Sequence, residues 1–180
     1  MTDFIELLKT RRSIRKYETR EIPESDLRMI FEAVQWSPSW ANTQCWELVA
    51  IKDGMVKEKL QATLPPVNPA SRAMLEAPVV IALCAKRETA GYYKGEKSTI
   101  FGDWLMFDLG IATQSICLAA WALGLGTVIV GLFDHGKARR ILSLPENYDL
   151  VAMIPVGYPA HASAAPKRRA VEEFVHWERF

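Results

Sequence analysis

The 180-residue sequence has few of the residues that build metal sites and disulfide frameworks. It contains three cysteines and three histidines, and these form neither a CxxC pair nor another Cys/His ligand spacing. Zinc, iron–sulfur and disulfide sites are therefore not expected, and reduced thiols favour a cytoplasmic protein. No Ser/His/Asp or Cys/His arrangement indicates a nucleophilic triad either.

An excess of charge of one sign is also missing. The 22 Lys and Arg residues nearly balance the 21 Asp and Glu residues, so the net charge is +1. Such a chain has no overall field that attracts nucleic acid or an anionic membrane, and neither partner is expected. The N-terminal stretch MTDFIELLKT carries acidic residues within its short apolar run, which is not the pattern of a signal peptide.

One long apolar run needs interpretation, because residues 109–133 carry no charge and are long enough to span a bilayer. Gly124 and Gly126 interrupt this run, and a polar Thr-Gln-Ser tripeptide lies inside it. The favoured interpretation is a buried helix that ends near Leu123, followed by a Gly-Leu-Gly turn and a strand over 127–130.

The remaining pattern predicts an α+β fold in which helices cover a mixed sheet, as a single domain over residues 1–180. Thr2 can cap the first helix, and Pro23 suits the first turn of a second helix that stops at Ser37. Further helices are expected over residues 53–63 and 134–142, and further strands over residues 46–51, 78–85 and 150–157.

A concentrated basic segment, KTRRSIRKY, stands near the N-terminus of this nearly neutral chain. On a helical turn Arg11 and Arg15 would share a face, and Ser13 would add a hydroxyl donor beside them. Guanidinium groups suit phosphate, although for this segment alone a solvated helix end is the simpler interpretation. A second basic group, PKRRA over residues 166–170, would make sense if both groups converged on one dianion.

The segment SPSWANTQCWE has the composition of a tight loop with unusual side chains. Asn42 and Gln44 offer amide groups that can recognise the edge of a flat heterocycle, although an ordinary helix-to-strand connection remains the alternative. Gly131 allows a ligand to approach the backbone closely, but the glycines around it match neither GxGxxG nor GxxxxGK[ST]. Since no acid, base or nucleophile is evident, a bound cofactor is expected to carry the chemistry.

The order of these segments resembles the nitroreductase family of FMN-dependent oxidoreductases. The matching pieces are RRSIRKY, SPSWANTQCWELVAI, LPPVN, DLGIATQSICLAAWALGLGT, VGLFD, LPENYDLVAMIPVGYPA and PKRR, which together cover nearly the whole chain. The resemblance implies a nitroreductase-like mixed β-sheet flanked by helices, and a homodimer with two FMN sites at the subunit interface.

The resemblance also implies which residues would bind FMN. Residues near the phosphate, ribityl chain and pyrimidine would be Arg11, Arg12, Ser13 and Arg15, with further phosphate contacts from Lys167 and Arg169 in the tail. The loop that the partner subunit lends to the flavin would contain Pro38, Ser39, Trp40 and Asn42. Asn68 would meet the flavin ring, and Gly131 and Leu132 would lie near its N5 atom. Arg15 would stabilise the negative charge that reduction places near flavin N1.

The expected reaction is hydride transfer from NADH or NADPH through flavin N5 to a small-molecule electron acceptor, namely a nitroaromatic, a quinone or free flavin, by a ping-pong mechanism. Two alternatives stay open: a specialised branch such as a reductive dehalogenase or a dehydrogenase, and a flavin-binding protein without turnover. The chain departs from the family pattern at Trp40, where small residues are common, and at Cys45, where the family often has proline.

Overall fold

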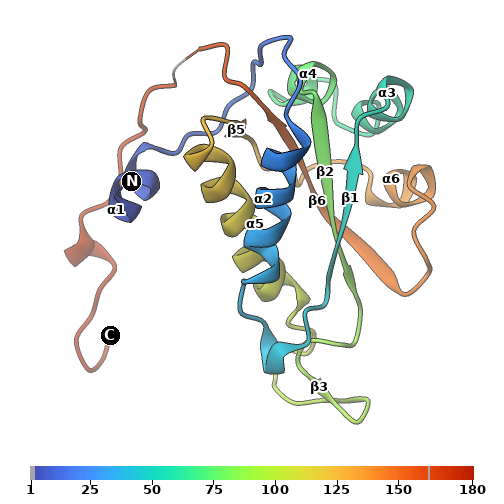
Figure 1. Ribbon diagram of the computed structural model, residues 1–180. Helices are drawn as coiled ribbons and strands as arrows, with labels where there is room; N and C mark the ends of the chain where they lie inside the picture. The colour runs from blue at the N-terminus through green and yellow to red at the C-terminus, as the bar shows by residue number, and fades with distance from the viewer. Residues whose placement is uncertain (1–2, 162) are drawn as a thin grey trace.

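The computed structural model describes residues 3–161 and 163–180. Its longer elements are α2, α5, β1, β2 and β6, and shorter helices and strands connect them (Figure 1). The helices are α1 (Phe4–Thr10), α2 (Glu24–Gln35), α3 (Gly54–Gln61), α4 (Ser71–Glu76), α5 (Leu105–Ala122) and α6 (His135–Ile141). The strands are β1 (Trp46–Ile51), β2 (Val79–Lys86), β3 (Tyr92–Tyr93), β4 (Glu96–Lys97), β5 (Gly126–Thr127) and β6 (Tyr148–Gly157).

The main sheet has the strand order β1-β2-β6-β5, and each neighbouring pair of these strands is antiparallel. A parallel bridge between Ser13 and Thr127 attaches the basic N-terminal segment to the β5 edge. The sheet is therefore mixed, and the predicted α+β fold is confirmed.

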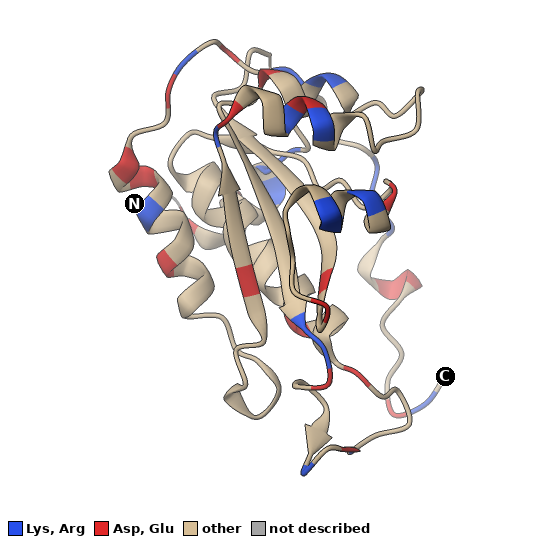
Figure 2. Ribbon diagram, turned by 90° about the vertical axis from the view of Figure 1, so that its right-hand side faces the viewer, with Lys and Arg blue, Asp and Glu red and all other residues tan. Residues whose placement is uncertain are grey.

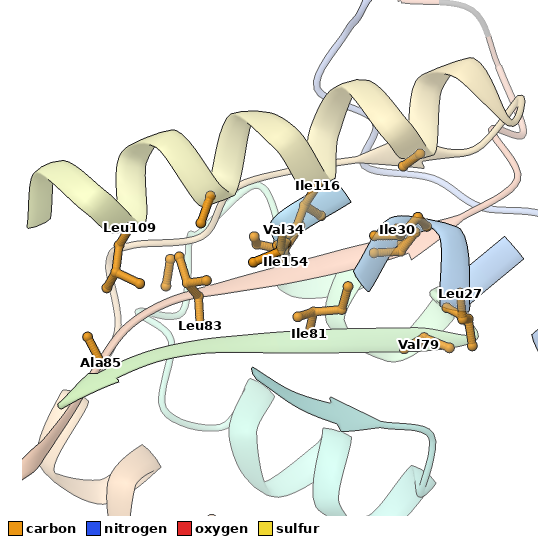
Figure 3. Close-up of a cluster of buried hydrophobic side chains, with 14 of the residues drawn as sticks. Leu27, Ile30, Val34, Val79, Ile81, Leu83, Ala85, Leu109, Ile116 and Ile154 are labelled. Carbon is orange, nitrogen blue, oxygen red and sulfur yellow. The ribbon is translucent and has the colours of Figure 1, made fainter. Parts of the chain in front are cut away.

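Helices cover both faces of this sheet, with α2 and α5 on one face and α3, α4 and α6 on the other (Figure 1). β2 is buried from Val79 to Ala85, so its alternate side chains supply both cores. Ile81 and Leu83 point to the α2 and α5 side, where they meet side chains of both helices (Figure 3). Each such buried Leu or Ile side chain stabilises the fold by about 1.5–3 kcal/mol.

The prediction of a buried core helix after residue 104 is confirmed. Eight residues of α5 are buried, and the helix ends before Gly124, which takes a left-handed φ of 75°. Among the described residues α5 is the one helix whose length and apolar composition would allow it to cross a membrane. Core helices of globular proteins often have the same length and composition. Its packing on α2 and the sheet accounts for that composition.

Charged residues lie mainly on the helices and loops, whereas the strands of the main sheet carry few of them (Figure 2). This distribution follows from burial, because a charged side chain inside a sheet that is covered on both faces would lose its hydration.

The structure corrects the prediction that Arg11 and Arg15 share a helical face. Helix α1 ends at Thr10, and the following segment is extended because the Ile14 N–H donates to the Thr127 carbonyl at 2.8 Å. In an extended chain the side chains of Arg11, Ser13 and Arg15 still share one side, now through the two-residue repeat of a strand.

Three smaller differences concern local elements. The strand expected over 127–130 is shorter, because β5 pairs only at Gly126 and Thr127 before a single bridge at Val130. The α1 cap is Asp3, whose carboxylate accepts from the Ile5 N–H at 3.2 Å, whereas Thr2 lies outside the described residues. Helix α4 was not predicted, since its six residues are too few to show a helical repeat.

Candidate functional site

The basic N-terminal segment is fixed against the sheet by close packing at Ile14. This side chain is 2% exposed and lies over Gly126, where a Cβ atom would come within 2.4 Å of Ile14 Cγ1. Only glycine fits at position 126 without displacing the segment. The side chains that alternate with Ile14, namely those of Ser13 and Arg15, are therefore directed away from the core.

A second anchor joins the end of α1 to the core helix. The indole Nε1 of Trp121 donates to the Thr10 hydroxyl at 3.0 Å. Arg12 completes this junction, since its Nη1 donates to the carbonyl oxygens of Lys9 at 2.6 Å and Arg11 at 2.8 Å. Arg12 thereby caps the C-terminal end of α1, so part of its hydrogen-bonding capacity is committed to the protein.

The two basic groups that are far apart in the sequence converge in the structure. A cavity of about 320 Å³ is lined by residues of the N-terminal segment and of the start of the C-terminal tail: Arg11, Arg12, Ser13, Arg15, Ser163, Ala164, Pro166 and Arg168. Arg12, one of these lining residues, also has a buried Nε atom without a hydrogen-bond partner in the described part of the chain. Several cations and an unpaired donor around one hollow favour a small polyanionic group.

The tail contributes Arg168 to this cavity, whereas sequence resemblance pointed to Lys167 and Arg169. Neither Lys167 nor Arg169 lines the cavity, and the Arg169 guanidinium lies 5.4 Å from the centre of the Phe174 ring. The only signal for Arg168 in the sequence was its place in the middle of the basic triplet. Because the triplet has no regular secondary structure, the sequence could not indicate which of its side chains faces the cavity.

Asn68 and the 131–132 segment are distant in the sequence but meet in the structure, in the chain that follows β5. The Asn68 Nδ2 donates to the Leu132 carbonyl at 3.3 Å, and His135 Nε2 lies 3.2 Å from the Gly131 carbonyl. Since a trans peptide directs its C=O and N–H in opposite directions, the Leu132 N–H is turned away from His135. Gly131 and Leu132 are both exposed, and Gly131 borders a cavity of about 750 Å³.

His135 was not among the predicted site residues, although it orients one of them. Its Nδ1 also lies 2.8 Å from the Leu150 carbonyl, and its ring stacks on Phe133 with centroids 3.9 Å apart. The imidazole thus ties the Gly131 backbone to β6. No sequence pattern marked this role of His135. The cap of α6 is Asp134, which accepts from the Lys137 N–H.

The loop from Ser37 to Gln44 is held at the N-terminal end of α5. The two carboxylate oxygens of Asp108 each lie 3.1 Å from the Trp40 nitrogen, which donates to them. The Trp40 ring packs on Trp104 with centroids 4.9 Å apart. Pro38 and Asn42 are exposed, so this loop presents polar and aromatic groups to the outside of the chain.

The loop and the basic cavity are far apart within one chain. The loop contacts α5 at Asp108, whereas the basic segment is tied to α5 at Trp121. With a helical rise of about 1.5 Å per residue, these two positions are about 20 Å apart. The chain therefore brings together the N-terminal and tail cations, and separately Asn68 with Leu132, but it does not bring the loop to the basic cavity.

A family model described as Nitroreductase family matches residues 8–158. The chain belongs to the nitroreductase family. A relative from Methanothermobacter thermautotrophicus, provisionally named an NADH dehydrogenase/NAD(P)H nitroreductase, is 38% identical over 162 residues, which cover 88% of this chain and 78% of the relative. The FMN reductase (NAD(P)H) of Bacillus subtilis is 30% identical over 197 residues, covering 100% of this chain and 75% of that protein.

The solved structures agree with this membership. The FMN-dependent nitroreductase of Clostridium difficile R20291 has a TM-score of 0.82 to this chain at 25% identity, with coverage of 98% of this chain and 100% of that chain. The nitroreductase fold is thus present over nearly the full length of the chain.

Cys45, one of the two departures from the nitroreductase pattern, is a buried thiol beside Asp108. Its Sγ lies 3.7 Å from Asp108 Oδ2. Burial first, and then the neighbouring Asp108 carboxylate, raise the pKa of Cys45 to about 12. The thiol therefore stays protonated near neutral pH, which argues against a nucleophilic role for Cys45.

Proposed function

We propose that this protein binds FMN and transfers hydride from NADH or NADPH to a small-molecule acceptor, a nitroaromatic, a quinone or free flavin. The observation that carries the proposal is the convergence of cations from the N-terminal segment and the tail on one cavity, which Arg11 and Arg168 line together with Ser13. Bound FMN would supply the hydride-accepting N5 atom. The names of the nitroreductase and FMN reductase relatives support the same activity.

The residues present fit the phosphate of FMN better than the pyrophosphate of FAD. Guanidinium groups can each offer two parallel charge-assisted hydrogen bonds to a terminal dianion, and the unpaired Arg12 Nε adds a donor. A buried pyrophosphate usually lies at a glycine-rich helix start, a motif that the sequence lacks. The Leu132 N–H points away from His135 and would be available as a donor to the flavin ring.

We propose further that residues 1–180 act as one domain that works as a homodimer in the cytoplasm. Within one chain the Ser37–Gln44 loop lies about 20 Å from the basic cavity along α5, so a second copy has to supply it to the same flavin. The outer side of α5 supports this assembly, because with Phe4 it lines an apolar groove of about 670 Å³. The three buried free thiols suit a reducing compartment.

The dimer is tested by sedimentation of the purified protein at micromolar concentration. A single species of twice the chain mass is expected, because the exposed Phe174 and Trp177 of the tail and the α5 groove would otherwise face water. A stable monomer that retains its FMN would contradict the proposal, since one chain would then be sufficient to build the site.

The activity is tested first by the identity of the flavin and then by its reduction. The purified protein is expected to be yellow and to release FMN on heating, as seen by chromatography. Anaerobic addition of NADH or NADPH should bleach the flavin, and an acceptor should restore the colour. Release of FAD would overturn the cofactor, and a loaded protein that neither nicotinamide bleaches would overturn the reaction. Parallel lines in two-substrate initial-rate plots would support the ping-pong mechanism.

A further inference from the structure

Helix α5 carries a single charged side chain, that of Asp108, and this side chain faces the protein interior. Asp108 is 1% exposed, and it forms no ion pair with any residue that the structure describes. Burial of a carboxylate without a cation is unfavourable unless hydrogen bonds replace its lost hydration. Its hydrogen-bond donors are the backbone N–H of Trp40 and the thiol of Cys45.

The loop that Asp108 holds has a backbone that needs support. Ala41, Asn42 and Gln44 have φ values of 44°, 55° and 47°, which are left-handed conformations that residues other than glycine rarely adopt. Such conformations persist only where surrounding contacts impose them. Inside the loop the Ser39 hydroxyl accepts from the Gln44 N–H at 2.9 Å, but this bond does not connect the loop to the rest of the fold.

Two contacts fasten this loop to α5. Asp108 binds the middle of the loop at Trp40, and the Ser115 hydroxyl meets the Ser37 hydroxyl at 2.6 Å at its start. The loop otherwise leaves a cavity of about 280 Å³ between itself and the helix, lined mainly by Trp40, Trp104 and neighbouring apolar groups. A carboxylate at the edge of that cavity is what fixes the distance between the loop and α5.

Direct participation of Asp108 in the reaction is excluded by its position. Both of its oxygens are engaged by the loop, and the side chain has almost no contact with the outside of the chain. It acts through Trp40, whose ring lies on Trp104 when the backbone N–H is held.

We propose that Asp108 is the positioning residue of the Ser37–Gln44 loop. It holds the backbone at Trp40, so that Trp40 and Trp104 form an aromatic wall and Ser39 and Asn42 are presented outward. This much concerns the fold of one chain. The next step rests on the proposed function: the same contact places the aromatic wall beside the flavin of the second copy, where the wall binds flat acceptors.

The first test measures hydrogen exchange in the FMN-free protein, so it does not depend on any activity. Asp108→Leu removes both acceptor oxygens, and exchange of peptides within 37–45 is expected to become at least about tenfold faster. Asp108→Asn keeps one acceptor oxygen for the Trp40 N–H and should restore most of the protection. Thr113→Val is the matched control, because Thr113 is also a buried polar residue of α5 but does not contact the loop.

Faster exchange confined to the loop in Asp108→Leu, with β2 and β6 unchanged, supports the proposal. Unchanged loop exchange, or an equal increase throughout the sheet, overturns it, because Asp108 would then have either no role or a purely general one. If the leucine variant does not fold, Asp108→Ser serves in its place, since a serine hydroxyl is too short to reach the Trp40 N–H.

The second test uses the FMN-loaded protein and a flat aromatic acceptor such as a nitrobenzoate. In Asp108→Leu the acceptor KM is expected to rise about tenfold, while kcat changes less, and Asp108→Asn should restore the KM. An unchanged KM in a variant whose loop exchanges faster would overturn the link to the acceptor. A wild-type protein without nicotinamide-linked reduction would instead overturn the proposed function, and the exchange result would still decide the role of Asp108 in the loop.

Discussion

Replacement of Arg15 by alanine is expected to slow the reduction of bound FMN by roughly tenfold to a hundredfold, the effect of losing one charge-assisted contact of about 1.5–3 kcal/mol. Arg15 is exposed, and its guanidinium makes only a 3.5 Å contact with the Ser13 carbonyl, so its charge remains available to a ligand. Stopped-flow reduction by NADH or NADPH under anaerobic conditions measures the rate. FMN should stay bound, because Arg11 and Arg168 remain.

Lys16→Ala is the matched control for this prediction. Lys16 is the next residue and is also exposed, but unlike Arg15 it does not line the basic cavity. In the Lys16→Ala variant, bound FMN should be reduced at the wild-type rate. Equal rates in wild type and the Arg15 variant at full FMN occupancy would refute the charge-stabilising role of Arg15. The reduction potential gives a second measure, since loss of a cation beside the flavin should lower it.

The second large effect is expected for FMN affinity in the double variant Arg11→Ala/Arg168→Ala. Each guanidinium lines the cavity that would hold the phosphate. Loss of both should raise the FMN dissociation constant by more than about a hundredfold, whereas each single variant should raise it by about tenfold. Quenching of FMN fluorescence during titration of the FMN-free protein measures the constant.

Arg169→Ala shows which cation of the tail matters. The family resemblance favours Lys167 and Arg169, whereas the cavity is lined by Arg168. We expect Arg169→Ala to change FMN affinity less than Arg168→Ala, because the Arg169 guanidinium lies over Phe174. The reverse order of effects would show that the tail binds the phosphate through alternate residues, with Arg168 turned outward.

The parts of the fold that the sequence predicted well are those with a strong local pattern. The continuous apolar run of β2 and the helical spacing of apolar residues in α2 can be recognised without the rest of the chain. The extended shape of the Arg11–Arg15 segment could not be predicted in this way. It depends on pairing of Ser13 with Thr127, which only the folded sheet brings together.

The candidate site shows the same division between local and long-range information. The basic N-terminal segment and the Ser37–Gln44 loop were recognisable from residue type, and family resemblance assigned their roles. Asp108 was passed over, because an aspartate in an apolar helix shows no partner nearby in the sequence. Its partner Trp40 is a backbone group from another element, and no side-chain pattern marks such a contact.

The cavity with the cations is built from the two ends of the chain, residues 11–15 and 163–168. The N-terminal half of this cavity is synthesised first, and the tail half follows only after the strands of the main sheet. A growing chain can pair Ser13 with Thr127 and fold the sheet, but it has no complete phosphate cavity until Arg168 has emerged. Cofactor loading would therefore have to wait until residues that follow the sheet in the chain have been synthesised.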